Sequence, residues 1–450
     1  MTKKEHIVVG LDIGTTKICA VVGEIQDDRS IHVIGVGSHR SNGLRKGMVV
    51  NMDSTVESIK RAVEEAELMS AVQINSVYTG IAGSHIGSES AQGVVALKKR
   101  EVTKADVRRA VDTARACAVP APDRQILHVL PREFIVDDQE GIRDPLGIAG
   151  SRLEVDVHIV TGAVTSAQNL IRCVSRAGLD VVDIVLQPLA SSAAVLTHEE
   201  KDLGVVMVDI GGGTTDIAIF VEGCIRHSAV LPIGGSHLTG DLAMGLKTAP
   251  EEAEKIKLKY GVASSLLVNE DEGIEVPSVG GRPPRVMPRA LVAEILSPRV
   301  EEMFELVLRE IRRAGYDGML VAGGVLTGGT SLLPGMAEVA EHVLNLSVRL
   351  GRPIGVEGLR EIVSNPSYST AVGLIVHSVS HENEFELVGP GAGKGKKSGR
   401  WAGGLVGKMK GWIMNFFLNH DKKGGSWIRA YFASQGESSI KCPRGRSGEW

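Results

Sequence analysis

The chain carries two copies of one unusual segment, an apolar run that is interrupted by a glycine-rich turn and then resumes. Residues 8–22 read VVGLDIGTTKICAVV, and residues 206–220 read VMVDIGGGTTDIAIF. Each copy predicts a strand, a tight turn that opens at Asp-Ile-Gly, and a second strand. Helical patterns follow each copy, so we expect an α/β chain whose second half repeats the plan of the first.

The glycine turns favour binding of an anion. A turn without Cβ atoms lets backbone N–H groups approach a ligand closely, and clusters of N–H groups bind phosphate. Two such turns facing each other across a cleft could hold phosphates from both sides, with Asp12 and Asp209 beside a hydrated Mg²⁺ and Lys17 neutralising charge. One turn alone could be an ordinary hairpin. The second copy and a third glycine-rich loop at 323–335 favour a nucleotide cleft, and the absence of GxxxxGK[ST] excludes a P-loop.

Composition narrows the class of protein. Of 450 residues, 43% are hydrophobic and 23% charged, as in soluble globular proteins. The five cysteines form no CxxC pair and the 13 histidines form no cluster, which predicts a reduced, cytoplasmic chain without structural zinc. We also expect no signal peptide, because the first strand begins almost at Met1, and no apolar stretch has the roughly 20 residues of a membrane span.

The C-terminal part has its own pattern. Residues 391–423 hold eight Lys/Arg against one Asp, a net charge of +7, which leaves about −11 for the rest. Residues 389–403 predict a flexible basic linker, and residues 404–420 predict an amphipathic helix in the headgroup region of a membrane. A helix packed on its own domain is the alternative. The expected membrane-facing residues are Leu405, Met409, Trp412, Ile413, Phe416 and Phe417, with Lys408 and Lys410 beside them.

Three local patterns make further predictions. Residues 52–70 predict a helix capped by Asp53 or Ser54. Within a small inserted α+β unit at about 82–160, Thr103 and Asp106 have the spacing of a capping box. Residues 289–315 predict a helix with a break near Pro298.

Five motifs together resemble the actin, sugar-kinase and heat-shock-chaperone ATPase superfamily. In family order they are DIGTTK (12–17), QPLASSAAVL (187–196), DIGGGTTD (209–216), GGVLTGGTSLLPG (323–335) and NPSYSTAVGLIVHS (365–378). The resemblance implies an actin-like, ribonuclease H-like duplicated fold with two lobes around a nucleotide cleft. Within the superfamily the chain resembles the FtsA family of bacterial cell-division proteins, through segments 144–162, 274–307 and 404–417.

The resemblance also implies roles for individual residues. Asp12 and Asp209 would organise Mg²⁺, Gln187 would position the attacking water, and Asp216 matches a second acid in the chaperones. Glu254 and Lys257 would contact the adenosine, and a solvated ion pair on a helix is the alternative. The other residues expected to bind ATP are Gly14, Thr15, Thr16, Lys17, Gly211, Gly212, Gly213, Thr214, Gly234, Gly235, Gly328 and Gly329.

For the whole chain, the resemblance implies an ATP-binding adaptor on the cytoplasmic face of the inner membrane at the division site. It would polymerise, anchor the tubulin-like protein FtsZ and help to recruit later division proteins, with slow ATP hydrolysis at most. A related pilus-assembly adaptor, a small-molecule kinase and a chaperone ATPase are the alternatives. The expected subdomains are 1A (1–81, 161–202, 365–388), 1C (82–160), 2A (203–240, 314–364) and the FtsZ-binding 2B (241–313), followed by the linker, the membrane helix and a tail at 421–450 of unassigned role.

Overall fold

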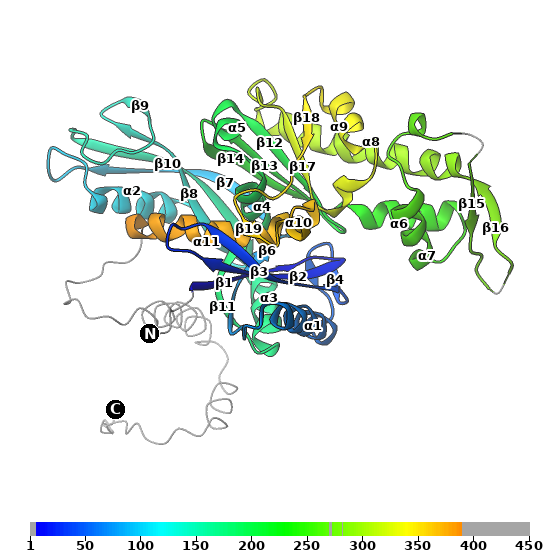
Figure 1. Ribbon diagram of the computed structural model, residues 1–450. Coiled ribbons are helices and arrows are strands. Elements are labelled where there is room, and N and C mark those ends of the chain that lie inside the picture. Colours follow the sequence, from blue (N-terminus) through cyan, green and yellow to red (C-terminus); the bar gives the residue numbers. More distant parts are fainter. Residues whose placement is uncertain (1–5, 270–271, 281, 389–450) are drawn as a thin grey trace, which may run out of the picture. The chain divides into compact units, whose positions relative to one another are not determined.

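The computed structural model describes residues 6–269, 272–280 and 282–388. The strands of the first repeat form a sheet in the order β11-β6-β1-β2-β3-β19 (Figure 1). Strands β1, β2 and β3 are antiparallel, while β6 joins β1, β11 joins β6 and β19 joins β3 in parallel. Their bounds are β1 (His6–Ile13), β2 (Lys17–Ile25), β3 (Ile31–Arg40), β6 (Ser76–Ile81), β11 (Asp180–Leu186) and β19 (Glu357–Gly358); a small hairpin, β4 (Leu44–Arg45) and β5 (Met48–Val49), lies beside them.

The second repeat forms a sheet with the same plan, in the order β14-β13-β12-β17-β18. Again three antiparallel strands come first, and two parallel strands extend the edge of the first of them. The two sheets therefore confirm the predicted duplicated α/β fold. The bounds are β12 (Val205–Ile210), β13 (Thr215–Val221), β14 (Cys224–Leu231), β17 (Gly324–Thr327) and β18 (Val348–Leu350).

Both faces of each sheet are buried, which explains the continuous apolar runs around the glycine turns. In β12, Val206 and Val208 enter one hydrophobic core, whereas Val205 and Met207 enter another. The second of these cores also receives residues of β2, such as Val21, and residues of the helices between the lobes. A strand with two buried faces needs apolar side chains at every position rather than at alternate positions.

Helices α4 and α11 pack against each other between the two sheets. The contact is backbone to backbone, because a Cβ atom on Gly373 of α11 would overlap the carbonyl oxygen of Ala190 in α4. Helices of the two lobes include α1 (Met52–Ser70), α3 (Val164–Arg176), α4 (Gln187–Val195), α5 (His198–Leu203), α9 (Met336–Leu344), α10 (Arg360–Val363) and α11 (Ser369–Val388), with 3₁₀ turns at Gly329–Leu332 and Pro366–Tyr368.

The structure corrects two of the local predictions. The cap of α1 is Asn51, whose Oδ1 accepts a hydrogen bond from the Ser54 N–H at 3.1 Å, so the helix begins before the predicted caps. Helix α8 (Arg289–Ala314) continues through Pro298 without a break. Pro298 lies on the exposed face, where water can satisfy the carbonyl that loses its partner, while the opposite face is held in the core.

The segment inserted after β6 forms a four-stranded sheet, β7-β10-β8-β9, with α2 packed on it. Thr103 and Asp106 form the predicted capping box at the start of α2. The bounds are β7 (Gly87–Ala96), α2 (Lys104–Cys117), β8 (Arg124–Val136), β9 (Gln139–Ile142) and β10 (Arg152–Ala163).

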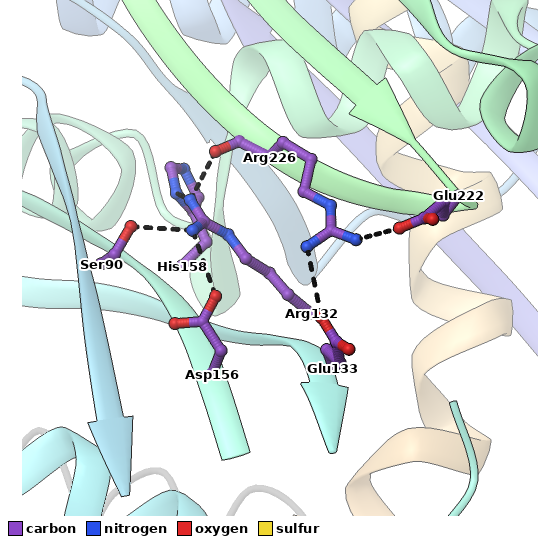
Figure 2. A network of polar contacts seen from close by, with 7 residues as sticks. All are labelled: Ser90, Arg132, Glu133, Asp156, His158, Glu222 and Arg226. Atoms are coloured by element: carbon purple, nitrogen blue, oxygen red, sulfur yellow. Dashed lines mark hydrogen bonds and ion pairs between the residues drawn. The ribbon is translucent and has the colours of Figure 1, made fainter. Parts of the chain in front are cut away.

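The insert contacts β14 of the second lobe through a buried polar network centred on Arg132 (Figure 2). Arg132 of β8 donates to Nδ1 of His158 at 2.9 Å and to the backbone carbonyl of Arg226 in β14. Nε2 of His158 lies 2.9 Å from the Ser228 hydroxyl. Since an arginine can only donate, the histidine Nδ1 must accept and its Nε2–H must donate to Ser228. Burial and the positive Arg132 lower the pKa of His158 to about 3.

The remaining part of the second lobe lies between β14 and β17. Its elements are α6 (Gly235–Gly245), α7 (Pro250–Tyr260), a 3₁₀ turn (Ser265–Leu267), β15 (Gly273–Val276), β16 (Arg285–Pro288) and α8. Within the described ranges, no helix combines the length and the apolar character that crossing a bilayer requires. The predicted linker, amphipathic helix and tail at 389–450 lie outside the described residues and stay predictions.

Candidate functional site

A cavity of about 630 Å³ lies where the two glycine turns meet, and residues of both repeats line it. The turn of the first repeat joins β1 to β2, and that of the second joins β12 to β13. Of the residues predicted for a nucleotide site, those that line the cavity are Asp12, Gly14, Thr15, Thr16, Lys17, Gln187, Asp209, Gly211, Gly212, Gly213, Thr214, Asp216, Gly235, Glu254, Lys257, Gly328 and Gly329. Gly234 is not in the lining but lies directly behind it, against Gly211 and Gly212.

The two turns have matching backbone geometry and face each other. The Gly14 N–H donates to the carbonyl of Lys17 at 3.0 Å, and the Gly211 N–H donates to that of Thr214 at 2.9 Å. A Cβ atom on Gly213 would lie 2.5 Å from the hydroxyl oxygen of Thr15, so any larger residue there would push the turns apart. Glycine is therefore required by the close approach of one turn to the other.

Two further segments fix the second turn. The N–H groups of Gly235 and Ser236, at the start of α6, donate to the carbonyls of Gly211 (3.0 Å) and Gly212 (2.7 Å). The Thr330 hydroxyl, beside Gly328 and Gly329, donates to the same Gly211 carbonyl at 2.9 Å. These bonds pair the carbonyl oxygens of Gly211 and Gly212 and so hold the second turn in place.

Three aspartates share the cavity and have raised pKa values. Withdrawal from water and the nearby Asp209 raise the pKa of Asp12 to about 7, against the opposing effect of Lys17. Burial raises the pKa of Asp209, although hydrogen bonds from Ser191 (2.6 Å) and Thr370 (3.3 Å) favour its charged form. Burial, Asp209 and Asp12 raise the pKa of Asp216 well above its usual range. Carboxylates held together in this way are poised to receive a cation.

The carboxylates fit a magnesium ion that is bound together with phosphates. Among the described residues no three His, Cys, Asp or Glu side chains form a metal-binding group. Mg²⁺ does not need one, because it keeps several waters and takes one or two carboxylates plus phosphate oxygens. Oδ1 of Asp216 is buried without a hydrogen-bond partner, and a metal-bound water would supply one.

Gln187 and Lys17 are both positioned by specific contacts. Nε2 of Gln187, the first residue of α4, donates to Oδ1 of Asp12 at 3.0 Å. Nζ of Lys17 donates to the Ser367 carbonyl at 2.6 Å and lies 3.8 Å from the centre of the Tyr368 ring. The lysine charge is thus held at the side of the cleft by the 3₁₀ turn before α11.

Lys257 is part of the cavity wall rather than a solvated helix residue. Its side chain is 11% exposed, its Nζ lies 2.8 Å from Glu254 Oε2, and it donates to the Gly235 carbonyl at 3.1 Å. The alternative of a surface ion pair therefore does not hold for Lys257. Glu254 also accepts from the Thr239 hydroxyl, so α6 and α7 are tied together behind the second turn.

Sequence reasoning missed several residues of the cavity. Ser191 and Thr370 orient Asp209; they belong to the motifs at 187–196 and 365–378, in which the sequence indicates a role for Gln187 alone. Thr330 follows the predicted Gly328 and Gly329 directly. His85 also lines the cavity, and no pattern in the sequence indicated it.

Comparison with solved structures supports the fold. A chain of the PilM-PilN type IV pilus biogenesis complex superimposes with a TM-score of 0.61 at 18% identity, covering 83% of this chain and 98% of the other. MreB 5 of Spiroplasma citri, bound to AMPPNP, gives a TM-score of 0.52 at 14% identity, covering 86% and 99%. The likeness to these proteins confirms the predicted actin-like architecture.

Comparison of sequences identifies the family. The family model "Cell division protein FtsA" matches residues 206–373, and the model "SHS2 domain inserted in FTSA" matches residues 83–161. Cell division protein FtsA of Pseudomonas aeruginosa is 48% identical over 411 residues, covering 91% of this chain and 98% of its own length. That of Escherichia coli K12 is 44% identical over 376 residues, covering 82% and 89%. The chain therefore belongs to the FtsA family of cell division proteins.

Proposed function

We propose that this member of the FtsA family binds ATP with Mg²⁺ in the cavity between the two glycine turns. The observation that carries the proposal is the cavity itself, in which two facing glycine turns and three aspartates of raised pKa converge. Gly14–Lys17 and Gly211–Thr214 would cradle the phosphates. Glu254, Lys257, Gly328 and Gly329 would contact the adenosine, and Asp12 and Asp209 would hold the ion through its waters.

Hydrolysis at this site would be slow. Bound Mg²⁺ supplies charge neutralisation on the phosphates. Gln187 is neutral and already donates to Asp12, so it can orient a water molecule but is a poor base. Burial, Asp209 and Asp12 raise the pKa of Asp216, so a charge on this side chain is disfavoured unless a cation binds beside it. We infer that ATP acts mainly as a ligand that sets the conformation of the two lobes.

A thermal unfolding experiment tests nucleotide binding. Mg²⁺-ATP at about 100 times its Kd should stabilise the protein by roughly 3 kcal/mol, seen as a rise in Tm. Gly213→Val should lose that rise, because its side chain would collide with Thr15. Gly240→Ala in α6, where a Cβ atom meets nothing within 4 Å, is the matched control and should keep it. A wild-type Tm that does not change when Mg²⁺-ATP is added would contradict the proposal.

At the level of the cell, we propose an adaptor that anchors FtsZ to the cytoplasmic face of the inner membrane, forms a head-to-tail polymer and helps to recruit later division proteins. Membership of the FtsA family supports this role. FtsZ would bind residues 241–313, and residues 404–420 would insert their apolar face between lipid headgroups. The basic linker would add attraction to anionic lipid of about 1 kcal/mol per charge.

Co-sedimentation with anionic vesicles tests the adaptor role. The full chain should pellet and carry purified FtsZ with it, whereas a chain ending at Gly403 should leave both in solution but still bind FtsZ in a pull-down. Trp412→Asp should weaken vesicle binding about tenfold or more. Asn415→Asp adds the same charge away from the apolar stripe and should have little effect. Equal losses for the two variants would refute the amphipathic helix.

A further inference from the structure

His85 is the residue of the cavity whose hydrogen bonding is unexplained. It lies in the connection between β6 and β7 and lines the cavity. Both ring nitrogens, Nδ1 and Nε2, are buried without a hydrogen-bond partner among the described residues. Leaving buried polar groups unpaired costs free energy, so an imidazole in this state points to a hydrogen-bond partner from outside the chain.

A chain of close contacts links His85 to the first glycine turn. The Gly47 N–H donates to the Thr15 hydroxyl at 3.1 Å, which ties the β4–β5 hairpin to the first turn. A Cβ atom on Gly47 would lie 2.9 Å from the Ala82 carbonyl oxygen, and one on Gly83 would lie 2.9 Å from His85 Nδ1. His85 and Thr15 are thus linked through Gly47 and the Ala82–Gly83 backbone of the first lobe.

The proposed adenosine contacts come from the opposite lobe. Glu254 and Lys257 lie on α7, and Gly328 and Gly329 follow β17. Gln187, by contrast, packs on the strand that leads to His85, because a Cβ atom on Gly80 of β6 would lie 2.8 Å from its Cγ. His85, Thr15 and Gln187 thus all line the cavity from elements other than those of the proposed adenosine contacts, on the side where a phosphate held by the first glycine turn would lie.

The charge state of His85 suits an uncharged hydrogen-bonding role. Burial and the nearby Arg124 lower its pKa to about 4, so the ring is neutral at physiological pH. Arg124 itself is turned to Thr161, to which it donates at 3.1 and 2.9 Å. A neutral imidazole offers one N–H donor and one acceptor nitrogen, which match a phosphoryl oxygen and a water molecule.

We propose that His85 donates a hydrogen bond to the terminal phosphate of a bound nucleoside triphosphate and thereby discriminates the triphosphate from the diphosphate. This inference rests on the proposed nucleotide site. His85 lies in the connection between β6 and β7, where the inserted sheet joins the first lobe. The presence or absence of the terminal phosphate would therefore change a hydrogen bond at this junction.

The test is a comparison of Mg²⁺-ATP and Mg²⁺-ADP affinities by calorimetry. His85→Ala should weaken ATP binding roughly tenfold, the value of a lost hydrogen bond to a charged group, and change ADP binding less than about twofold. His85→Gln keeps an N–H donor and should recover part of the loss. His342→Ala, an exposed histidine of α9, is the matched control and should match the wild type.

The outcomes separate this inference from the proposed function. Equal losses for ATP and ADP in His85→Ala would show that the ring only supports the cavity wall and would overturn the inference. Unchanged affinity for both nucleotides would overturn it as well. In either case nucleotide binding by the wild type would leave the proposed function intact, whereas a wild type that binds neither nucleotide would overturn both.

Discussion

The charge on Asp12 lowers the stability of the folded protein but suits this residue to binding a cation. It lies at the end of β1, accepts a hydrogen bond from Gln187, and has its pKa raised to about 7 by loss of water and by Asp209. Folding therefore favours the protonated form. The stabilising contribution of that form is complete below the unfolded pKa near 3.9 and is lost as pH rises through about 7.

Asp12→Asn should stabilise the nucleotide-free protein at pH 8 by roughly 1 kcal/mol, since partial contact with water screens the full effect. The gain should shrink at pH 5, where wild-type Asp12 is largely protonated, and the rise of Tm with Mg²⁺-ATP should be reduced or lost. Thermal unfolding at the two pH values checks both expectations. Asp112→Asn, on the exposed face of α2, should show neither effect. A gain that is independent of pH would contradict the assigned titration.

At the scale of elements, the contact of α4 with α11 should be sensitive to a single methyl group. Gly373 lets the two helices touch through their backbones, and a Cβ atom there would overlap the Ala190 carbonyl oxygen. Backbone atoms cannot move aside as a flexible side chain can, so we expect Gly373→Ala to lower the free energy of unfolding by about 2–4 kcal/mol.

The control for this prediction is Gly240→Ala, also inside a helix but with open space at the Cβ position. It should be neutral or stabilise by up to about 1 kcal/mol through helix propensity. Urea unfolding of both variants decides the matter. If Gly373→Ala proves as stable as Gly240→Ala, the helices are not held in backbone contact.

The same elements show which features the sequence could predict. The two hairpin turns were predictable because Asp-Ile-Gly-Thr-Thr and its repeat determine both the turn and the groups that line it from residues adjacent in the sequence. The orientation of Asp209 by Thr370 was not, because 161 residues separate them and only the α4–α11 packing brings them together. The predicted helix break at Pro298 was wrong for a related reason. Burial of one face of α8 stabilises the helix by more than the local effect of the proline destabilises it.

At the scale of the whole molecule, the insert connects the two lobes. Its strand β8 and helix α2 contact β11 and α11, and the Arg132 network joins it to β14 (Figure 2). Strand β14 is followed, after two residues, by Gly234 and Gly235, which lie behind the second glycine turn. A buried network at this position should make stability depend on the histidine it contains.

His158 should make the protein less stable in mild acid. Arg132, His227 and His128 all lie near it, and together with burial they lower its pKa to about 3. Below the unfolded pKa near 6.5 the unfolded chain takes up a proton that the folded chain cannot, so the free energy of unfolding falls with pH until about pH 3. The loss from this one group reaches about 2 kcal/mol at pH 5.

His158→Gln separates this linkage from the carboxylates and from His85. At pH 7.5 it should cost roughly 1–2 kcal/mol, because it disturbs the bonds to Arg132 and Ser228. Since glutamine does not titrate, the difference from the wild type should narrow by about 1–2 kcal/mol at pH 5. His342→Gln, in an exposed position, should follow the wild type at both pH values. Urea midpoints give the comparison, and a difference that stays constant with pH would mean that His158 takes up its proton without the insert leaving β14.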